Sequence, residues 1–261
     1  MVTNNSVALY SIEEVSKQLL GSVFGELPDE TKVLITQNQK SYFQALTENL
    51  QKIAKDSSDV KKIIDSPDFQ YISKTASISA SRSSSSDLHK NLSSLIVQRV
   101  NFDNEDLKRI VYNEAITTIE KLTSDQLKIL TLCFLLKRTK VNGLINIEQF
   151  KHYLSQKIRP FINFKRTSAE FEHLAYTGCA SISIASNTIA SIFKTNYPDI
   201  FKDTENPEEL LSGDGTAIEL SSAWKDSQIQ NMNLTSVGIV IASTYYEQTT
   251  GDRIDIDIWI N

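Results

Sequence analysis

Basic and aromatic residues alternate between positions 157 and 166, in a pattern that could bind nucleic acid. The stretch contains Lys157, Arg159, Phe161, Phe164, Lys165 and Arg166. Such basic side chains can hold phosphates while the rings stack against bases. The same two rings would also suit the packed end of a bundle helix, so nucleic-acid or nucleotide binding is kept as an alternative. With three basic residues upstream, the candidate set is Lys137, Arg138, Lys140, Lys157, Arg159, Lys165 and Arg166.

Two further groupings could support hydrolysis. Asp255 and Asp257 alternate with isoleucine, and paired carboxylates can hold Mg²⁺ or divide acid and base roles. Cys179 follows Gly178 with His173 six residues before it, a spacing that would allow a cysteine nucleophile beside a base. An edge strand and a buried thiol explain the same residues equally well. We therefore assign no catalytic residue, and a hydrolase or nuclease remains a second alternative.

The sequence contains no compact metal or cofactor motif. Its histidines, His89, His152 and His173, are far from one another along the chain, and no Cys-x-x-Cys pair is present. The glycine-rich phosphate loops Gly-x-x-x-x-Gly-Lys-Ser/Thr and Gly-x-Gly-x-x-Gly are also missing. We expect neither a metal nor a cofactor.

Charge is distributed unevenly along the chain. The net charge is -5, but residues 137–172 hold eight basic and three acidic residues, a net charge of +5. Residues 199–261 hold twelve acidic and three basic residues, a net charge of −9. Two such segments either complement each other within the fold or between subunits, or form a binding face.

Composition favours a helical chain. Of 261 residues, 40% are hydrophobic, and only 8 are Gly and 5 are Pro, too few for the turns of an all-β sandwich. The first ten residues lack the basic and apolar regions of a signal peptide. The longest apolar run, 127–136, is about half of the roughly 20 residues that cross a bilayer. Together with cysteines that lack disulfide or metal spacing, this predicts a cytoplasmic protein without membrane contact.

Helix start signals and apolar stripes organise most of the chain. Ser66-Pro67-Asp68 predicts a helix start, Thr123 with Gln126 predicts a capping box, and the run 127–136, apolar on nearly every side, predicts a central bundle helix. Strand-like alternation appears at 180–184 and at 254–260. The predicted fold is mainly α, a multi-helix bundle with a small C-terminal β element. We expect an extended lead-in at 1–10, a helical bundle at 11–163 and a C-terminal sub-domain at 164–261 with two short strands.

Several blocks resemble a family of uncharacterised bacterial proteins known only by locus tags. The resemblance covers roughly residues 65–201, and its clearest blocks are Ser66–Tyr71, Asp87–Arg99, Leu135–Lys140, Leu174–Ile184 and Phe193–Pro198. The central helices are also loosely similar to abortive-infection and phage-defence domains of unknown function. The resemblance implies a bacterial, defence-linked context and carries over no catalytic residue.

Together these observations predict a non-enzymatic helical protein that acts through protein–protein contacts. The resemblance adds the expectation of a sensor or regulator in phage defence. Helix faces with small residues and a terminal strand edge also predict a homo-oligomer.

Overall fold

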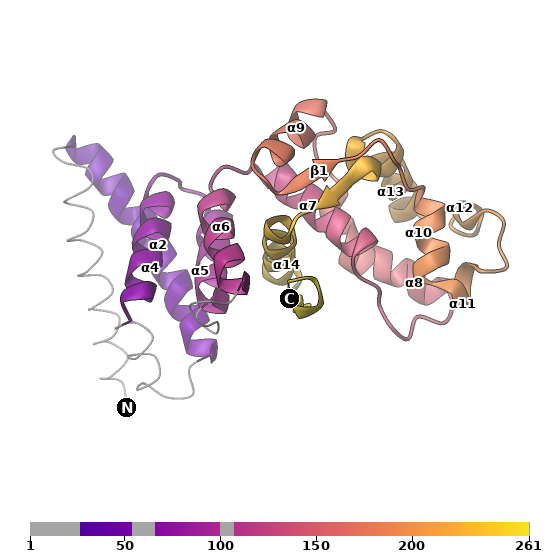
Figure 1. Ribbon diagram of the computed structural model, residues 1–261, viewed down its shortest axis with the longest axis horizontal. Helices are drawn as coiled ribbons and strands as arrows, with labels where there is room; N and C mark the ends of the chain where they lie inside the picture. Colours follow the sequence, from indigo (N-terminus) through magenta and orange to yellow (C-terminus); the bar gives the residue numbers. More distant parts are fainter. Residues whose placement is uncertain (1–26, 54–65, 100–106, 261) are drawn as a thin grey trace. The chain divides into compact units, whose positions relative to one another are not determined.

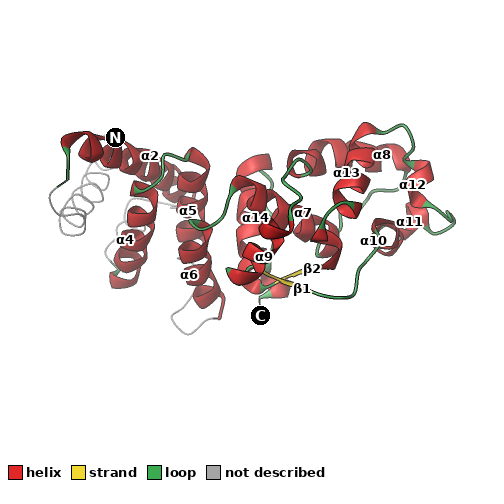
Figure 2. Cartoon of the chain, turned by 90° about the horizontal axis from the view of Figure 1, so that it is seen from above, coloured by secondary structure: helices red, strands yellow, loops and turns green. Residues whose placement is uncertain are grey.

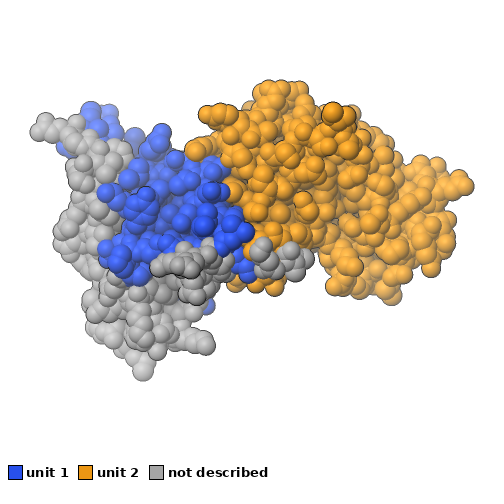
Figure 3. All heavy atoms as spheres, viewed as in Figure 1, with its two compact units in different colours: residues 1–120, 261 blue, residues 121–260 orange. Residues whose placement is uncertain are grey.

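The computed structural model describes residues 27–53, 66–99 and 107–260 (Figure 1). These residues form twelve α-helices and one two-stranded sheet, which confirms the predicted fold class (Figure 2). The lead-in predicted at 1–10 lies outside the described residues. Contacts divide the chain into two compact units, residues 1–120 with 261 and residues 121–260 (Figure 3).

Four described helices build the N-terminal unit. They are α2 (Asp29–Ile53), α4 (Pro67–Ser81), α5 (Ser86–Arg99) and α6 (Leu107–Ile119). Helix α5 packs against each of the other three. The predicted start signal is confirmed at α4, where the Ser66 hydroxyl accepts a hydrogen bond from the Phe69 N–H and Pro67 occupies the first turn.

Polar contacts tie these helices to one another. His89 Nε2 lies 3.1 Å from the Ala80 carbonyl and 2.8 Å from the Ser83 carbonyl, and its Nδ1 lies 2.9 Å from Ser41 Oγ. Because carbonyl oxygens only accept, Nε2 carries a proton and donates to this pair of carbonyls. The buried Arg99 guanidinium contacts Asp68 at 2.5 Å, and Arg109 contacts the same carboxylate at 2.6 Å.

The C-terminal unit is built around α7 (Ser124–Lys137) and α14 (Ser236–Thr250), which pack against each other. The capping box predicted at Thr123 and Gln126 is present, and ten of the fourteen α7 residues are buried, as expected for a central helix. Helix α14 is likewise buried from Val237 to Tyr246.

The C-terminal unit contains further short elements. They are α8 (Ile147–Tyr153), the π-helical turn η1 (Leu154–Ile158), the 3₁₀ turn η2 (Arg159–Phe161), α9 (Ser168–Tyr176), α10 (Ile189–Asn196), α11 (Pro198–Phe201), α12 (Pro207–Leu210), α13 (Gly215–Lys225) and η3 (Gln228–Asn231). Strand β1 (Ala180–Ile182) pairs antiparallel with β2 (Met232–Leu234), with Ser181 opposite Asn233.

Hydrogen bonds join the residues just before β1 to the residue that caps α14. Thr235 donates a backbone hydrogen bond to the Cys179 carbonyl at 3.1 Å, and its hydroxyl donates to the Gly178 carbonyl at 2.6 Å. The Cys179 carbonyl also approaches Gly238 so closely that a β-carbon there would collide with it. A glycine is therefore needed at this crossing.

One sequence prediction differs from the structure. The strand predicted at 254–260 is wrong: this segment ends in the 3₁₀ turn η4 (Asp257–Trp259), and β2 is the partner of β1. Ile256 and Ile260 are buried by this turn, so the alternation records burial and not pairing. The helix that begins at Ile147 becomes π-helical at Leu154, and the acidic segment 199–261 contains the eleven-residue helix α13.

The two compact units divide between Glu120 and Lys121, and the boundary predicted between residues 163 and 164 lies within the second unit. Helix α7 belongs to this second unit because it contacts α14, β2, η2 and α9, which all lie later in the chain. Among the described helices, none is both long enough and apolar enough to cross a membrane.

Candidate ligand-binding cavity

A change of helix type positions the candidate site. The Asn146 side chain caps α8 by accepting from the Gln149 N–H, and the helix runs to Tyr153. From Leu154 the turn widens, and the Arg159 N–H donates to the Leu154 carbonyl five residues earlier. Pro160 has no N–H and cannot continue an α-helix, so the chain leaves through the 3₁₀ turn η2. Single π-helical turns inside helices occur frequently at functional sites.

A cavity of about 730 Å³ lies beside this turn. One face of α8 and η1 forms much of its lining, together with the loop before α8 and the end of α14. Its apolar and aromatic lining consists of Val141, Leu144, Tyr153 and Tyr246. Its polar lining consists of Glu148, Gln149, His152, Gln156, Lys157 and Asp252. This volume lies within the range of small-molecule sites.

An ion pair crosses the rim of the cavity. The Lys157 ammonium of η1 contacts the Asp252 carboxylate, which follows α14 directly after Gly251. Gly251 has a φ of 76° and ends α14 in the left-handed conformation that glycine adopts readily. The hydrogen bond that Lys157 donates to Asp252 raises the pKa of Lys157, so this side chain stays cationic at neutral pH.

Two tyrosines form the deeper wall. Tyr153 and Tyr246 are both buried, and burial raises the pKa of both phenols. Tyr246 Oη donates to Asp252 at 3.4 Å, and Tyr153 shares a hydrogen bond with Tyr197. Both tyrosines are therefore neutral hydrogen-bonding groups at physiological pH.

An aromatic cluster holds α8 in place behind this wall. The Phe150 ring is fully buried, and its centroid lies 5.0 Å from those of Phe193, Tyr197 and Phe201. Edge-to-face packing of this kind fixes ring orientation. The cavity therefore has a rigid back wall with one cation, two carboxylates and several neutral polar groups around its rim. Its chemistry is suited to holding an organic molecule.

The structure places the seven basic residues predicted for nucleic acid in different environments. Lys137 is half-buried: its ammonium donates to the Gln230 and Met232 carbonyls at 2.9 and 2.8 Å, and burial lowers its pKa. Arg166 contacts Ser222 and Asp226, and Lys157 contacts Asp252. The remaining four are exposed: Arg138, Lys140, Arg159 and Lys165.

The predicted aromatic partners of these residues lie in the core. Phe161 is fully buried against Tyr245 and Tyr246 of α14, and Phe164 is also buried. In this structure neither ring is exposed to stack against a base. The contacts Lys157–Asp252 and Arg166–Asp226 instead join the basic and acidic segments within the fold.

The residues considered for hydrolysis lie in different environments. Cys179 is fully buried, and burial raises the pKa of its thiol, which disfavours the reactive thiolate. His173 Nδ1 contacts the Gln126 side chain of α7. Asp255 and Asp257 are exposed, and the Asp257 N–H donates to the Asp255 carboxylate. Within residues 27–53, 66–99 and 107–260, no group of three or more His, Cys, Asp or Glu residues is arranged to hold a metal ion.

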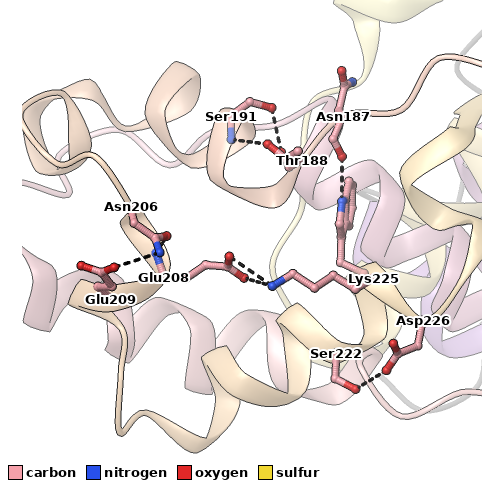
Figure 4. A network of polar contacts seen from close by, with 10 residues as sticks. Asn187, Thr188, Ser191, Asn206, Glu208, Glu209, Ser222, Lys225 and Asp226 are labelled. Atoms are coloured by element: carbon pink, nitrogen blue, oxygen red, sulfur yellow. Dashed lines mark hydrogen bonds and ion pairs between the residues drawn. The ribbon is translucent and has the colours of Figure 1, made fainter.

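A second, smaller hollow of about 330 Å³ lies between α12 and α13. Figure 4 shows Glu208 of α12 and Lys225 of α13 reaching toward each other, with contacts of 2.9 and 3.2 Å. Asp226 accepts from Ser222 on the same helix (Figure 4). Because these charged and polar side chains already pair with one another, the hollow offers a ligand fewer polar groups to bind than the cavity beside η1 does.

Sequence reasoning missed most of the cavity. Only Lys157 belonged to the candidate set, and Asp252 and Tyr246 lie about ninety residues beyond it in the chain. One usable signal exists: Glu148, His152 and Gln156 are spaced by four residues and form a polar row on a single helix face.

A family model matches residues 8–218 and 202–260 of the chain. Its description, ":-like", is that of an uncharacterised family named after a locus tag, which agrees with the resemblance to proteins known only by such tags. No curated protein and no solved structure matches the chain.

Proposed function

The chain belongs to this uncharacterised family, whose name states no activity, and from the structure we propose that its C-terminal unit is a non-enzymatic ligand-binding module. The observation that carries the proposal is the cavity of about 730 Å³ beside the π-helical turn. Large apolar cavities with a few converging polar groups and shifted pKa values are the usual form of small-molecule sites.

A binding role accounts for the groups around the cavity better than a catalytic one. The two tyrosines are neutral at physiological pH, and the one lysine is held cationic by its carboxylate partner. A tyrosine or lysine acting as a general base or nucleophile would need a pKa moved toward neutrality, and the pKa values of Tyr153, Tyr246 and Lys157 are raised instead. Shape and hydrogen bonding are what this cavity supplies.

Dye binding tests the proposal. N-phenyl-1-naphthylamine is a neutral apolar dye whose fluorescence rises in an apolar site, and we expect saturable binding to the protein. Leu144→Trp places a larger side chain in the cavity and should weaken binding at least about tenfold.

Ile145→Trp is the matched control. Ile145 is the next residue on the same loop, is 67% exposed and does not line the cavity, so this variant should bind the dye like the original protein. Equal affinity in both variants, or no saturable binding by the original protein, would contradict the proposal. Circular dichroism of each variant checks that it is folded.

The protein–protein contacts and self-association expected from the sequence fit this proposal as the properties that ligand binding would control. A ligand-dependent change in a protein contact would make the chain a sensor or regulator, as its resemblance to phage-defence domains implies. Light scattering with and without ligand tests self-association. Nucleic-acid binding stays a prediction from the exposed basic residues, and an electrophoretic shift assay at low salt tests it.

A further inference from the structure

The Lys157–Asp252 pair at the cavity rim can exchange partners at low cost. The two side chains are 32% and 50% exposed, and they come from separate elements, η1 and the segment after α14. Exposed pairs of this kind contribute little to stability. A ligand group of suitable charge can therefore replace one member without disrupting the fold.

The consequences of the two possible exchanges differ. If an anion takes Lys157, Asp252 keeps the hydroxyl of Tyr246 as a donor at 3.4 Å and remains open to water. If a cation takes Asp252, Lys157 loses the one carboxylate that contacts it among the described residues. The arrangement therefore favours an incoming anion, because both original groups then keep a partner.

The rest of the lining suits the body of such a molecule. Val141 and Leu144 offer aliphatic surface, and the Tyr153 ring adds an aromatic face. His152 and Gln156 lie on the same helix face as Lys157 and can donate to the oxygens of an anionic group. A ligand can thus place its apolar part on the loop before α8 and its charged end at η1.

We propose that the cavity binds a small amphipathic anion, with its carboxylate or phosphate on Lys157 and its apolar body against Val141, Leu144 and Tyr153. This inference rests on the proposed ligand-binding function and names the chemical class of the ligand. It also gives the π-helical turn a role, since η1 carries Lys157 to the rim.

Two dyes that differ in charge test the inference. 1-Anilinonaphthalene-8-sulfonate carries the same aromatic body as N-phenyl-1-naphthylamine with one added sulfonate. We expect Lys157→Met to weaken sulfonate dye binding about tenfold while leaving the neutral dye within about twofold. Asp252→Asn should strengthen sulfonate dye binding, because it removes the carboxylate that competes for Lys157.

Lys165→Met makes the same charge change at an exposed position outside the cavity and should alter neither dye. If Lys157→Met leaves sulfonate binding unchanged, or Asp252→Asn weakens it, the anion preference is overturned while the cavity remains a binding site. If neither dye binds the original protein, the proposed function itself fails. Displacement of the sulfonate dye by octanoate or by octyl phosphate, with octanol as the uncharged control, then distinguishes a carboxylate ligand from a phosphate monoester.

Discussion

The two compact units differ in the polar contacts that join their helices. In the N-terminal unit Asn49 donates to the buried Ser93 hydroxyl, Asn38 donates to the Ser81 carbonyl, and His89 contacts three segments. In the α7–α14 pair the buried Ser243 hydroxyl bonds within its own helix, and the buried Thr131 hydroxyl reaches the Ala242 carbonyl of the other helix. Most buried side chains of α7 and α14 are apolar, so this core is specified mainly by apolar packing, whereas several directional contacts join the N-terminal helices.

This difference predicts which kind of substitution destabilises each unit most. A polar contact between helices stabilises one geometry and becomes costly when one partner is lost. An apolar core tolerates conservative exchange of side chains and is sensitive to lost volume. The following substitutions test this contrast in order of expected effect.

The largest effect is expected for Phe134→Ala in α7. Phe134 is fully buried and its ring lies 5.4 Å from that of Trp259. The cavity left behind should cost the C-terminal unit about 3–5 kcal/mol of unfolding free energy, measured by denaturant titration with hydrogen exchange to locate the loss. Phe134→Leu keeps most of the volume and should cost clearly less; equal costs for the two variants would contradict packing as the cause.

His89→Ala should be the next largest and should act on the N-terminal unit. The substitution leaves the Ala80 and Ser83 carbonyls and the Ser41 hydroxyl without the ring, at a cost of about 1–3 kcal/mol. Amide exchange in α2, α4 and α5 should rise, while that in α7 and α14 should not. Lys90→Ala, the exposed neighbour on α5, is the control, and a His89 effect no larger than this control would remove the contrast between the units.

Acid should weaken the N-terminal unit through Asp68. Its hydrogen bond with Arg99 holds the pKa of Asp68 below 3.8. Because the folded-state pKa is depressed, the contribution is complete above the unfolded value and is lost as the pH falls through the folded value. Hydrogen exchange or thermal unfolding between about pH 6 and about pH 3 should show this loss of stability. The Asp68→Asn variant should show a weaker dependence of stability on pH.

Asp29→Asn serves as the comparison for Asp68. Asp29 is almost fully exposed and pairs with Lys32 at 3.2 Å, so its removal should leave the acid response nearly unchanged. If the N-terminal unit of the Asp68→Asn variant loses as much stability in acid as the original protein, groups other than Asp68 cause that loss.

The smallest effect, with the opposite sign, is expected for Tyr42→Phe. Tyr42 is fully buried, and among the described residues its hydroxyl has no hydrogen-bond partner. Removing an unpaired buried hydroxyl should stabilise the N-terminal unit by about 1 kcal/mol in a denaturant titration. A loss of stability would show that this hydroxyl is satisfied in solution and that the polar network extends further.

Local signals predicted the helices well because their physics is local. The cap at Ser66 and the capping box at Thr123 are satisfied within a few residues, so spacing alone identifies them. The C-terminal alternation failed for the same reason. Alternating isoleucines are typical of a strand, but the segment ends in the turn at Asp257–Trp259, and only the position of a partner strand could have decided between the two.

The cavity was not predicted from local sequence patterns. Lys157 and Asp252 meet because α8 and η1 lie near the end of α14, and no spacing in the sequence encodes that approach. Phe161 shows a similar limit. Its place among basic residues left both an exposed ring and a packed ring open, and its contacts with the α14 tyrosines, more than eighty residues away, determine its burial.

The junction of Thr235 with Gly178 and Cys179 has a mechanical consequence. It joins two parts of the C-terminal unit that are more than fifty residues apart, and β1 and β2 continue the seam beyond it. The exposed stretch Ile184–Thr188 lies within the loop that this seam closes. A single protease nick there would therefore leave two fragments held together without a covalent link, so the C-terminal unit could be reconstituted from separately made halves.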